Sequence, residues 1–231
     1  MRFLQLREPG YALLVGAGIE IGGFEHPAVL PNARKLTRCD RLLKEEVAGV
    51  FTEIDVAGLP PVDVRLDLDT EGLGVFADAS LDFVVCCHVL EHLKNPLKAL
   101  AEIMRTLRRG GRAALAVPDK AFTFDQDRPL TAWESLERIY REKITTPVPA
   151  DYMDIVRHVH PQMLAVGEAE RQGYLEHLLK RREHLNIWDS RTFADFLEKS
   201  RIRLGLGWRP LYVATAAQSR FEYFTVLEKT S

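Results

Sequence analysis

The sequence is poor in cysteine, and its few cysteines do not suit a disulfide framework. Only three occur among 231 residues, and Cys86 and Cys87 are neighbours in an apolar run, where the side chains of a strand point to opposite faces. The sequence also lacks an apolar run of about 18 residues that could span a bilayer, and its start lacks the apolar core of a signal peptide. We therefore expect a protein of the reducing cytoplasm.

A strong excess of charge is missing as well. The formal net charge of −2 gives no general attraction to nucleic acid or to an anionic membrane. Internal repeats and low-complexity tracts are also lacking. The remaining composition is that of an ordinary globular protein, and its 46% of hydrophobic residues can form the core of a single domain over residues 1–231.

The clearest local pattern is a strand, a polar loop and a helix. Residues 83–87 form a short apolar run typical of a strand buried on both faces. Asn95 is a suitable helix cap and Pro96 suits the first helical position, after which apolar residues recur at helical spacing until Gly110 and Gly111. In a parallel sheet a ligand sits beside the loop that follows such a strand. The polar side chains of this loop are His88, Glu91 and His92.

The same loop contains a second pattern. Residues 88–92 spell H-x-x-E-H, a zinc-protease signature in which two histidines one helical turn apart bind the metal and the glutamate serves as base. That motif requires a helix, whereas His88 directly follows the apolar strand and a helix cap comes only at Asn95. We therefore expect no metal in this segment. A zinc hydrolase remains the least favoured function, and an ordinary polar loop remains possible.

Strands and helices alternate along the first half of the chain. Gly22 and Gly23 follow the first strand and let backbone approach a bound nucleotide or nucleoside, while Asp40 ends the second strand about 20 residues later, where a carboxylate can bind ribose hydroxyls. The alternation predicts a parallel sheet with right-handed crossovers. Strands are expected around residues 19–21, 35–40, 62–68, 83–87 and 112–117, with a final hairpin from residues 210–216 and 220–228.

Residues 120–188 depart from this pattern. They contain several prolines and two amphipathic helices, over 133–140 and 168–179, and no evident strand. So long an excursion after a strand predicts a helical lid or acceptor-binding insertion. Three aromatic side chains are expected to stack on an acceptor, which are Trp133, Tyr140 and Tyr152.

Four stretches together look like a class I S-adenosylmethionine-dependent methyltransferase: residues 19–23, 69–73, 81–92 and 107–119. The resemblance implies a doubly wound, Rossmann-like α/β sheet of seven strands whose last strand is antiparallel, with the helical insertion after strand five. Residues 117–131 and 183–189 further resemble methyltransferase type 11-like enzymes met among bacterial glycan and polysaccharide genes.

The resemblance also implies site residues. Glu20, Gly22 and Gly23 match the loop around the amino acid and ribose of S-adenosylmethionine, although Phe24 stands where many members have a further glycine. The other matches are Asp40 at the ribose hydroxyls, Asp69 with the backbone of Thr70 beside the adenine, and His88 at the methionine end.

The function predicted from this resemblance is methyl transfer to a small acceptor, with O-methylation of a carbohydrate or nucleotide sugar favoured over nucleic acid. A hydroxyl acceptor must lose a proton, and histidine is the usual base near neutral pH. The candidate catalytic residues are His88, Asp119 and His160, with His92, His158, His184 and Asp125 as further possibilities. The alternative is a protein of the same fold that binds the cofactor without catalysis.

Overall fold

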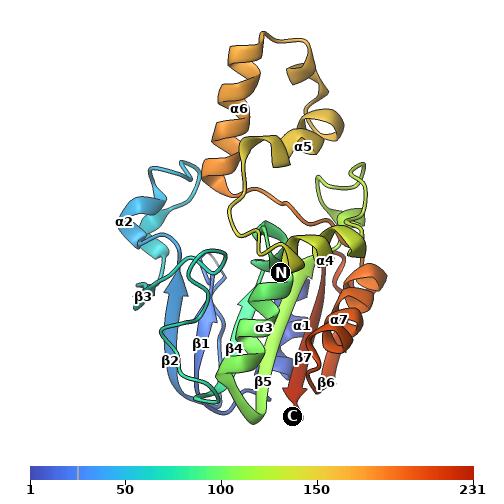
Figure 1. Ribbon diagram of the computed structural model, residues 1–231. Helices are drawn as coiled ribbons and strands as arrows, with labels where there is room; N and C mark the ends of the chain where they lie inside the picture. The colour runs from blue at the N-terminus through green and yellow to red at the C-terminus, as the bar shows by residue number, and fades with distance from the viewer. Residues whose placement is uncertain (25) are drawn as a thin grey trace.

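Seven strands form one mixed sheet in the order β3-β2-β1-β4-β5-β7-β6 in the computed structural model, which describes residues 1–24 and 26–231 (Figure 1). Strand β7 is antiparallel to both neighbours, and the other pairings are parallel, as the resemblance implied. The strands are β1 (Gly16–Ile21), β2 (Ala33–Asp40), β3 (Val64–Arg65), β4 (Leu81–Cys87), β5 (Leu107–Pro118), β6 (Trp208–Ala214) and β7 (Glu222–Lys229).

Helices cover both faces of this sheet. On one face the main core joins alternate side chains of β1 and β4 to apolar residues of α3 (Pro96–Thr106) and α7 (Ser190–Leu204). A second core on the other face includes residues of α1 (Arg2–Tyr11), which lies behind the sheet in Figure 1. The other helices are α2 (Lys44–Val47), α4 (Trp133–Arg141), α5 (Met153–His158), α6 (Glu168–Arg181) and α8 (Ala216–Ser219), and the 3₁₀ turns are η1 (Val56–Gly58), η2 (Leu90–His92), η3 (Lys120–Phe122), η4 (Pro149–Tyr152) and η5 (Pro161–Leu164).

The central βα unit forms for the local reasons that the sequence indicates. The Asn95 side chain accepts a hydrogen bond of 3.0 Å from the Lys98 N–H and caps α3, and Pro96 occupies the first turn. Strand β4 is almost wholly buried, and β1 and β5 pair with it on either side. The loop after β4 therefore opens at the carboxyl ends of parallel strands.

Several boundaries differ from the predictions. The helix ends at Thr106, and Gly110 and Gly111 lie inside a long β5 instead of stopping the helix. The third strand has only two residues, and the expected hairpin turn contains the short helix α8. The pattern in residues 2–11 did not predict α1, which has Pro9 inside it and only weak amphipathic character.

The insertion between β5 and α7 is largely helical. Its helices α5 and α6 project beyond the carboxyl edge of the sheet (Figure 1). They share a small core of their own, formed by Tyr152, Ile155, Val156, Leu175 and Leu178. Across the described residues, no helix is both long and apolar enough to cross a membrane.

Candidate functional site

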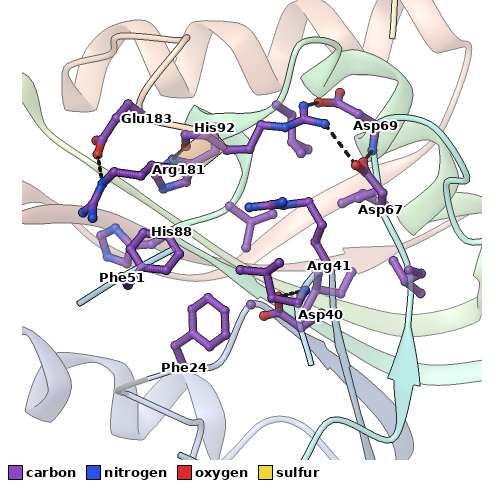
Figure 2. Close-up of a pocket in the computed structure, with 18 of the residues that line it drawn as sticks. Phe24, Asp40, Arg41, Phe51, Asp67, Asp69, His88, His92, Arg181 and Glu183 are labelled. Atoms are coloured by element: carbon purple, nitrogen blue, oxygen red, sulfur yellow. Dashed lines mark hydrogen bonds and ion pairs between the residues drawn. The ribbon is translucent and has the colours of Figure 1, made fainter. Parts of the chain in front are cut away.

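A first cavity of about 390 Å³ opens at the carboxyl ends of the parallel strands (Figure 2). The loops after β1, β2, β3 and β4 line it, together with residues 181–183 at the end of the insertion. Strand β1 lies between β2 and β4, so the chain turns to opposite sides of the sheet at this point. Ligands of open α/β sheets bind in that crevice.

Gly22 forms the close turn at the base of this cavity. Its φ is +74°, and an added Cβ would lie 2.5 Å from Cγ2 of Val89 on the loop after β4. A side chain at this position would therefore be strained and would meet its neighbour. The glycine permits the bare backbone cradle that a ribose or amino acid group needs, which fits the cofactor implied by the sequence.

Asp40 lies at the end of β2 and lines the same cavity. It is 8% exposed, and its Oδ1 accepts a hydrogen bond of 3.0 Å from the Leu42 N–H. Burial raises the pKa of Asp40 to about 6, although hydrogen bonds from the backbone of Leu42 and Arg41 oppose the shift. Figure 2 shows the Arg41 side chain extending across the cavity beside this acid.

Two acids follow β3 at this edge of the sheet. Asp69 borders the cavity, but its side chain is fully buried and accepts hydrogen bonds from the backbone N–H groups of Lys94 and Asn95. Thr70 is exposed and lies outside the set of described residues that line either cavity. Asp67, which the sequence did not single out, is the less buried acid of the pair at this wall. Arg182 binds both acids, at 3.0 Å from Asp67 and 3.2 Å from Asp69.

Aromatic rings form the opposite wall. Phe24 and Phe51 meet edge to face with their centroids 6.2 Å apart, and the Arg181 guanidinium lies 4.6 Å from the Phe51 ring. Arg181 also pairs with Glu183, as Figure 2 shows, and with Glu53, and both acids line the cavity. The first cavity thus has a flat apolar side and a polar, charged side, as a nucleoside requires.

His88 begins the loop after β4 with a φ of +56°. Its Nε2 lies 2.7 Å from Glu222 and its Nδ1 lies 3.2 Å from Glu91, while its ring stacks on Phe221. Burial alone would lower the pKa of His88, but the contacts with the two carboxylates outweigh it and raise the pKa to about 9. A proton would have to leave before His88 could act as the predicted base.

Glu222 also pairs with Arg7 of α1, with Nη2 and Oε2 2.5 Å apart and both side chains buried. Through Glu222, this ion pair connects helix α1 and strand β7 to His88. The distance in sequence between His88 and Glu222 is 134 residues, so no local pattern could have predicted the contact.

A second cavity of about 620 Å³ lies on the α1 side of the Gly22 loop. Glu20 and Gly23 line this cavity and are not among the described residues that line the first, so the predicted cofactor loop has one side toward each. Glu20 is 2% exposed and accepts a hydrogen bond from the Ala28 N–H, which braces the loop. Among the described residues, four line both cavities, namely Ile21, Gly22, Phe24 and His88.

Two other predicted catalytic residues lie elsewhere. Asp119 accepts hydrogen bonds from Ala121, and from the backbone and hydroxyl of Ser190, so its carboxylate caps η3 and the start of α7. His160 lies between α5 and η5 against Tyr174. Neither belongs to the cavity-lining residues of the described chain. The structure therefore does not bring Asp119 and His160 to the cavity with His88.

Three of the further candidates, His92, His184 and Asp125, lie next to one another. His92 lines the first cavity, and burial together with neighbouring His184 lowers the pKa of His92 to about 4. His184 binds Asp125 through a contact of 2.6 Å. These three side chains come together at the junction of the β4 loop and the insertion, whereas His158 ends α5.

The aromatic residues expected to stack on an acceptor are packed into the protein instead. Trp133 lies against Phe196, Tyr140 lies beneath the Arg203 guanidinium, and Tyr152 is fully buried in the core of α5 and α6. Neither cavity includes any of Trp133, Tyr140 and Tyr152 among its described lining residues. That expectation was wrong, because aromatic residue type and position within the insertion do not distinguish an acceptor surface from a helix interface.

Comparison with known proteins gives an independent indication. Residues 55–115 match the model of a methyltransferase domain. An uncharacterized 37.1 kDa protein in transposon TN4556 of Streptomyces fradiae is 36% identical over 105 residues, which are 45% of this chain. The chain matches only 28% of that relative's length.

Solved structures match nearly the whole chain, whereas the sequence matches cover only part of it. The YcgJ protein from Bacillus subtilis has a TM-score of 0.52 at 13% identity, with 99% of this chain and 98% of the other covered. A SAM-dependent methyltransferase from Aquifex aeolicus has a TM-score of 0.50 at 14% identity, with 98% and 89% covered. At such low sequence identities, these structural similarities show the fold alone. The chain as a whole therefore has the α/β fold of these structures, and residues 55–115 match a methyltransferase domain.

Proposed function

We propose that the protein transfers a methyl group from S-adenosylmethionine in the first cavity to a small acceptor in the second. The observation that carries this proposal is the shared boundary of the two cavities at Gly22, Phe24 and His88. A donor and an acceptor in adjoining cavities can meet in line without either crossing the protein. The methyltransferase domain match supports the donor half of this assignment.

The residues of the first cavity suit the cofactor. S-adenosylmethionine supplies a methyl group bound to a positively charged sulfur. Gly22 admits ligand close to the backbone, and Asp40 is placed to accept hydrogen bonds from ribose hydroxyls. Phe24 and His88 lie where the two cavities meet, and there they orient the donor toward the acceptor and exclude water.

For the acceptor we propose a sugar that carries a negatively charged group, methylated on oxygen. The second cavity is lined in part by the ring of Phe221, which packs between Phe3 and His88 and adds apolar surface that a sugar can contact. Arg2 and Arg220 are exposed and line the same cavity, so they can bind phosphate or carboxylate. These features favour a sugar phosphate or nucleotide sugar over a neutral sugar.

The insertion then has a narrower role than first expected. Its residues Arg181, Arg182 and Glu183 border the first cavity, which supports a cover over the nucleoside end of the cofactor. We propose that acceptor choice depends mainly on the second cavity, where α1 and the segment before β7 supply the lining. All three cysteines are free, which supports the expected reducing, cytoplasmic location.

The experiment measures cofactor binding and methyl uptake separately. Calorimetric titration with S-adenosylhomocysteine comes first, followed by transfer of labelled methyl to neutral sugars, sugar phosphates and nucleotide sugars. Phe221→Ala should raise the KM for the acceptor by about tenfold, since it removes an aromatic contact, and should leave cofactor affinity unchanged. Tyr174→Ala on α6 is the matched control. Binding without uptake by any acceptor would favour the alternative of a protein that has lost catalysis, and failure to bind would reject the proposal.

A further inference from the structure

Three side chains outside the methyl-transfer junction converge on one point. Possible ligand atoms of Glu91, His92 and His184 all lie within 4.8 Å of one another. Glu91 is 0% exposed, and within residues 1–24 and 26–231 neither of its carboxylate oxygens has a hydrogen-bond partner. Its ion-pair contact with His88, at 3.2 Å, leaves most of its acceptor capacity unused. An unsatisfied buried carboxylate is costly and calls for a bound cation or proton.

The hydrogen bonds of the two histidines prepare their other nitrogens to bind a metal. Nδ1 of His92 lies 2.6 Å from the carbonyl oxygen of Arg182, which can only accept, so this nitrogen carries the proton. Nδ1 of His184 lies 2.6 Å from the Asp125 carboxylate and donates to it. Both Nε2 atoms therefore keep their lone pairs. Metal-bound histidines have this arrangement, with a carbonyl or carboxylate behind the ring.

Backbone contacts hold the three side chains in place. The Glu91 carbonyl accepts hydrogen bonds from the N–H groups of Leu185 and Asn186, at 2.7 and 2.9 Å. The Asn186 side chain donates to the carbonyls of Leu90 and Leu93, at 3.2 and 2.6 Å. Hydrogen bonds thus join residues 185–186, at the end of the insertion, to residues 90–93 of the loop after β4.

We propose that Glu91, His92 and His184 bind a divalent transition-metal ion, for which zinc is the best match. Two imidazole nitrogens and one carboxylate oxygen form a donor set typical of zinc and related ions. Zinc with bonds of about 2.1 Å holds tetrahedral ligands about 3.4 Å apart, so separations of up to 4.8 Å must contract by up to about 1.4 Å. His92 also lines the first cavity, so the proposed site borders that cavity.

This inference replaces the expectation of no metal, but it does not restore the H-x-x-E-H motif. His88 directly follows β4 and residues 90–92 form a 3₁₀ turn, so the segment is not the α-helix that the motif requires. His88 instead contacts Glu222. The third ligand comes from His184, which follows the insertion helices. The site would join the insertion to the cofactor cavity, and it does not depend on methyl transfer.

The test is zinc binding by the full chain after treatment with a chelator. Calorimetry with zinc chloride and elemental analysis should show one ion per chain, and Co²⁺ should give the absorption of a four-coordinate site. His184→Ala and Glu91→Gln should each weaken binding at least about 100-fold, and Asp125→Asn about 10- to 100-fold, because it removes the group behind His184. His177→Ala, which removes an exposed histidine on α6, should bind as the wild type does.

The outcomes separate this site from surface binding. Circular dichroism shows which variants fold, and His184→Ala decides the question if Glu91→Gln does not fold. The proposal is rejected if the wild type takes up no zinc or cobalt, if His177→Ala loses binding as His184→Ala does, or if folded variants of both Glu91 and His184 retain wild-type affinity.

Discussion

Replacement of Asp40 by asparagine tests whether this acid serves the cofactor or the fold. Asparagine keeps an oxygen that can accept the hydrogen bond from Leu42 but removes the charge. If the Asp40 carboxylate accepts ribose hydroxyls, Asp40→Asn should cost about 1.5 to 3 kcal/mol of binding at pH 7, or about 10- to 100-fold in affinity for S-adenosylhomocysteine. Calorimetric titration measures this directly.

The pKa of Asp40 adds a pH dependence with a definite sign. Because the pKa in the free protein is about 6, the carboxylate is mostly ionised at pH 7 and mostly neutral at pH 5. Wild-type affinity for S-adenosylhomocysteine should therefore fall about tenfold from pH 7 to pH 5, and that of Asp40→Asn should change little. Asp55→Asn, an exposed acid that caps η1, is the control and should retain the wild-type profile.

Asp40→Asn should raise the free energy of unfolding at high pH, although it weakens binding of S-adenosylhomocysteine. Burial raises the pKa of Asp40 from 3.8 to about 6, so the neutral form favours the fold and its contribution is lost as pH rises through 6. At pH 8, Asp40→Asn should thus be more stable than the wild type by up to about 3 kcal/mol, measured by urea unfolding. Unchanged binding in Asp40→Asn, or a wild-type affinity that is flat between pH 5 and 7, would refute the assignment.

Three further substitutions test other parts of the structure. Gly22→Ala should reduce affinity for S-adenosylhomocysteine by at least about tenfold and lower Tm, because its φ is positive and Val89 is close; normal binding would show that this turn does not form the cofactor cradle. Arg7→Leu should destabilise the fold by about 3 to 5 kcal/mol in urea unfolding, because it removes the arginine from a buried ion pair and leaves Glu222 with His88 alone, and a loss under 1 kcal/mol would contradict this account. His160→Ala should leave both S-adenosylhomocysteine affinity and the rate of methyl transfer near wild type, since it lies outside both cavities as described; a large fall in kcat would return it to the catalytic candidates.

The sequence by itself determined the elements whose causes are local. A run of apolar residues predicted β4, and the cap at Asn95 with Pro96 predicted α3, because these signals act over a few residues. The same holds for the glycine turn after β1 and for Asp40 at the end of β2. Parallel strands place such ends at one edge of the sheet, so the position of the first cavity also followed from the sequence.

Tertiary structure decided what each side chain at that edge does. Asp69 and Asp67 are nearly equivalent in sequence, yet the N–H groups of Lys94 and Asn95 bind Asp69 and bury it. His88 has the position of a base, but Glu222 from β7 pairs with it. These partners approach from distant segments because burial of apolar faces packs those segments together, and a pattern of residue types along the chain does not specify which polar groups then meet.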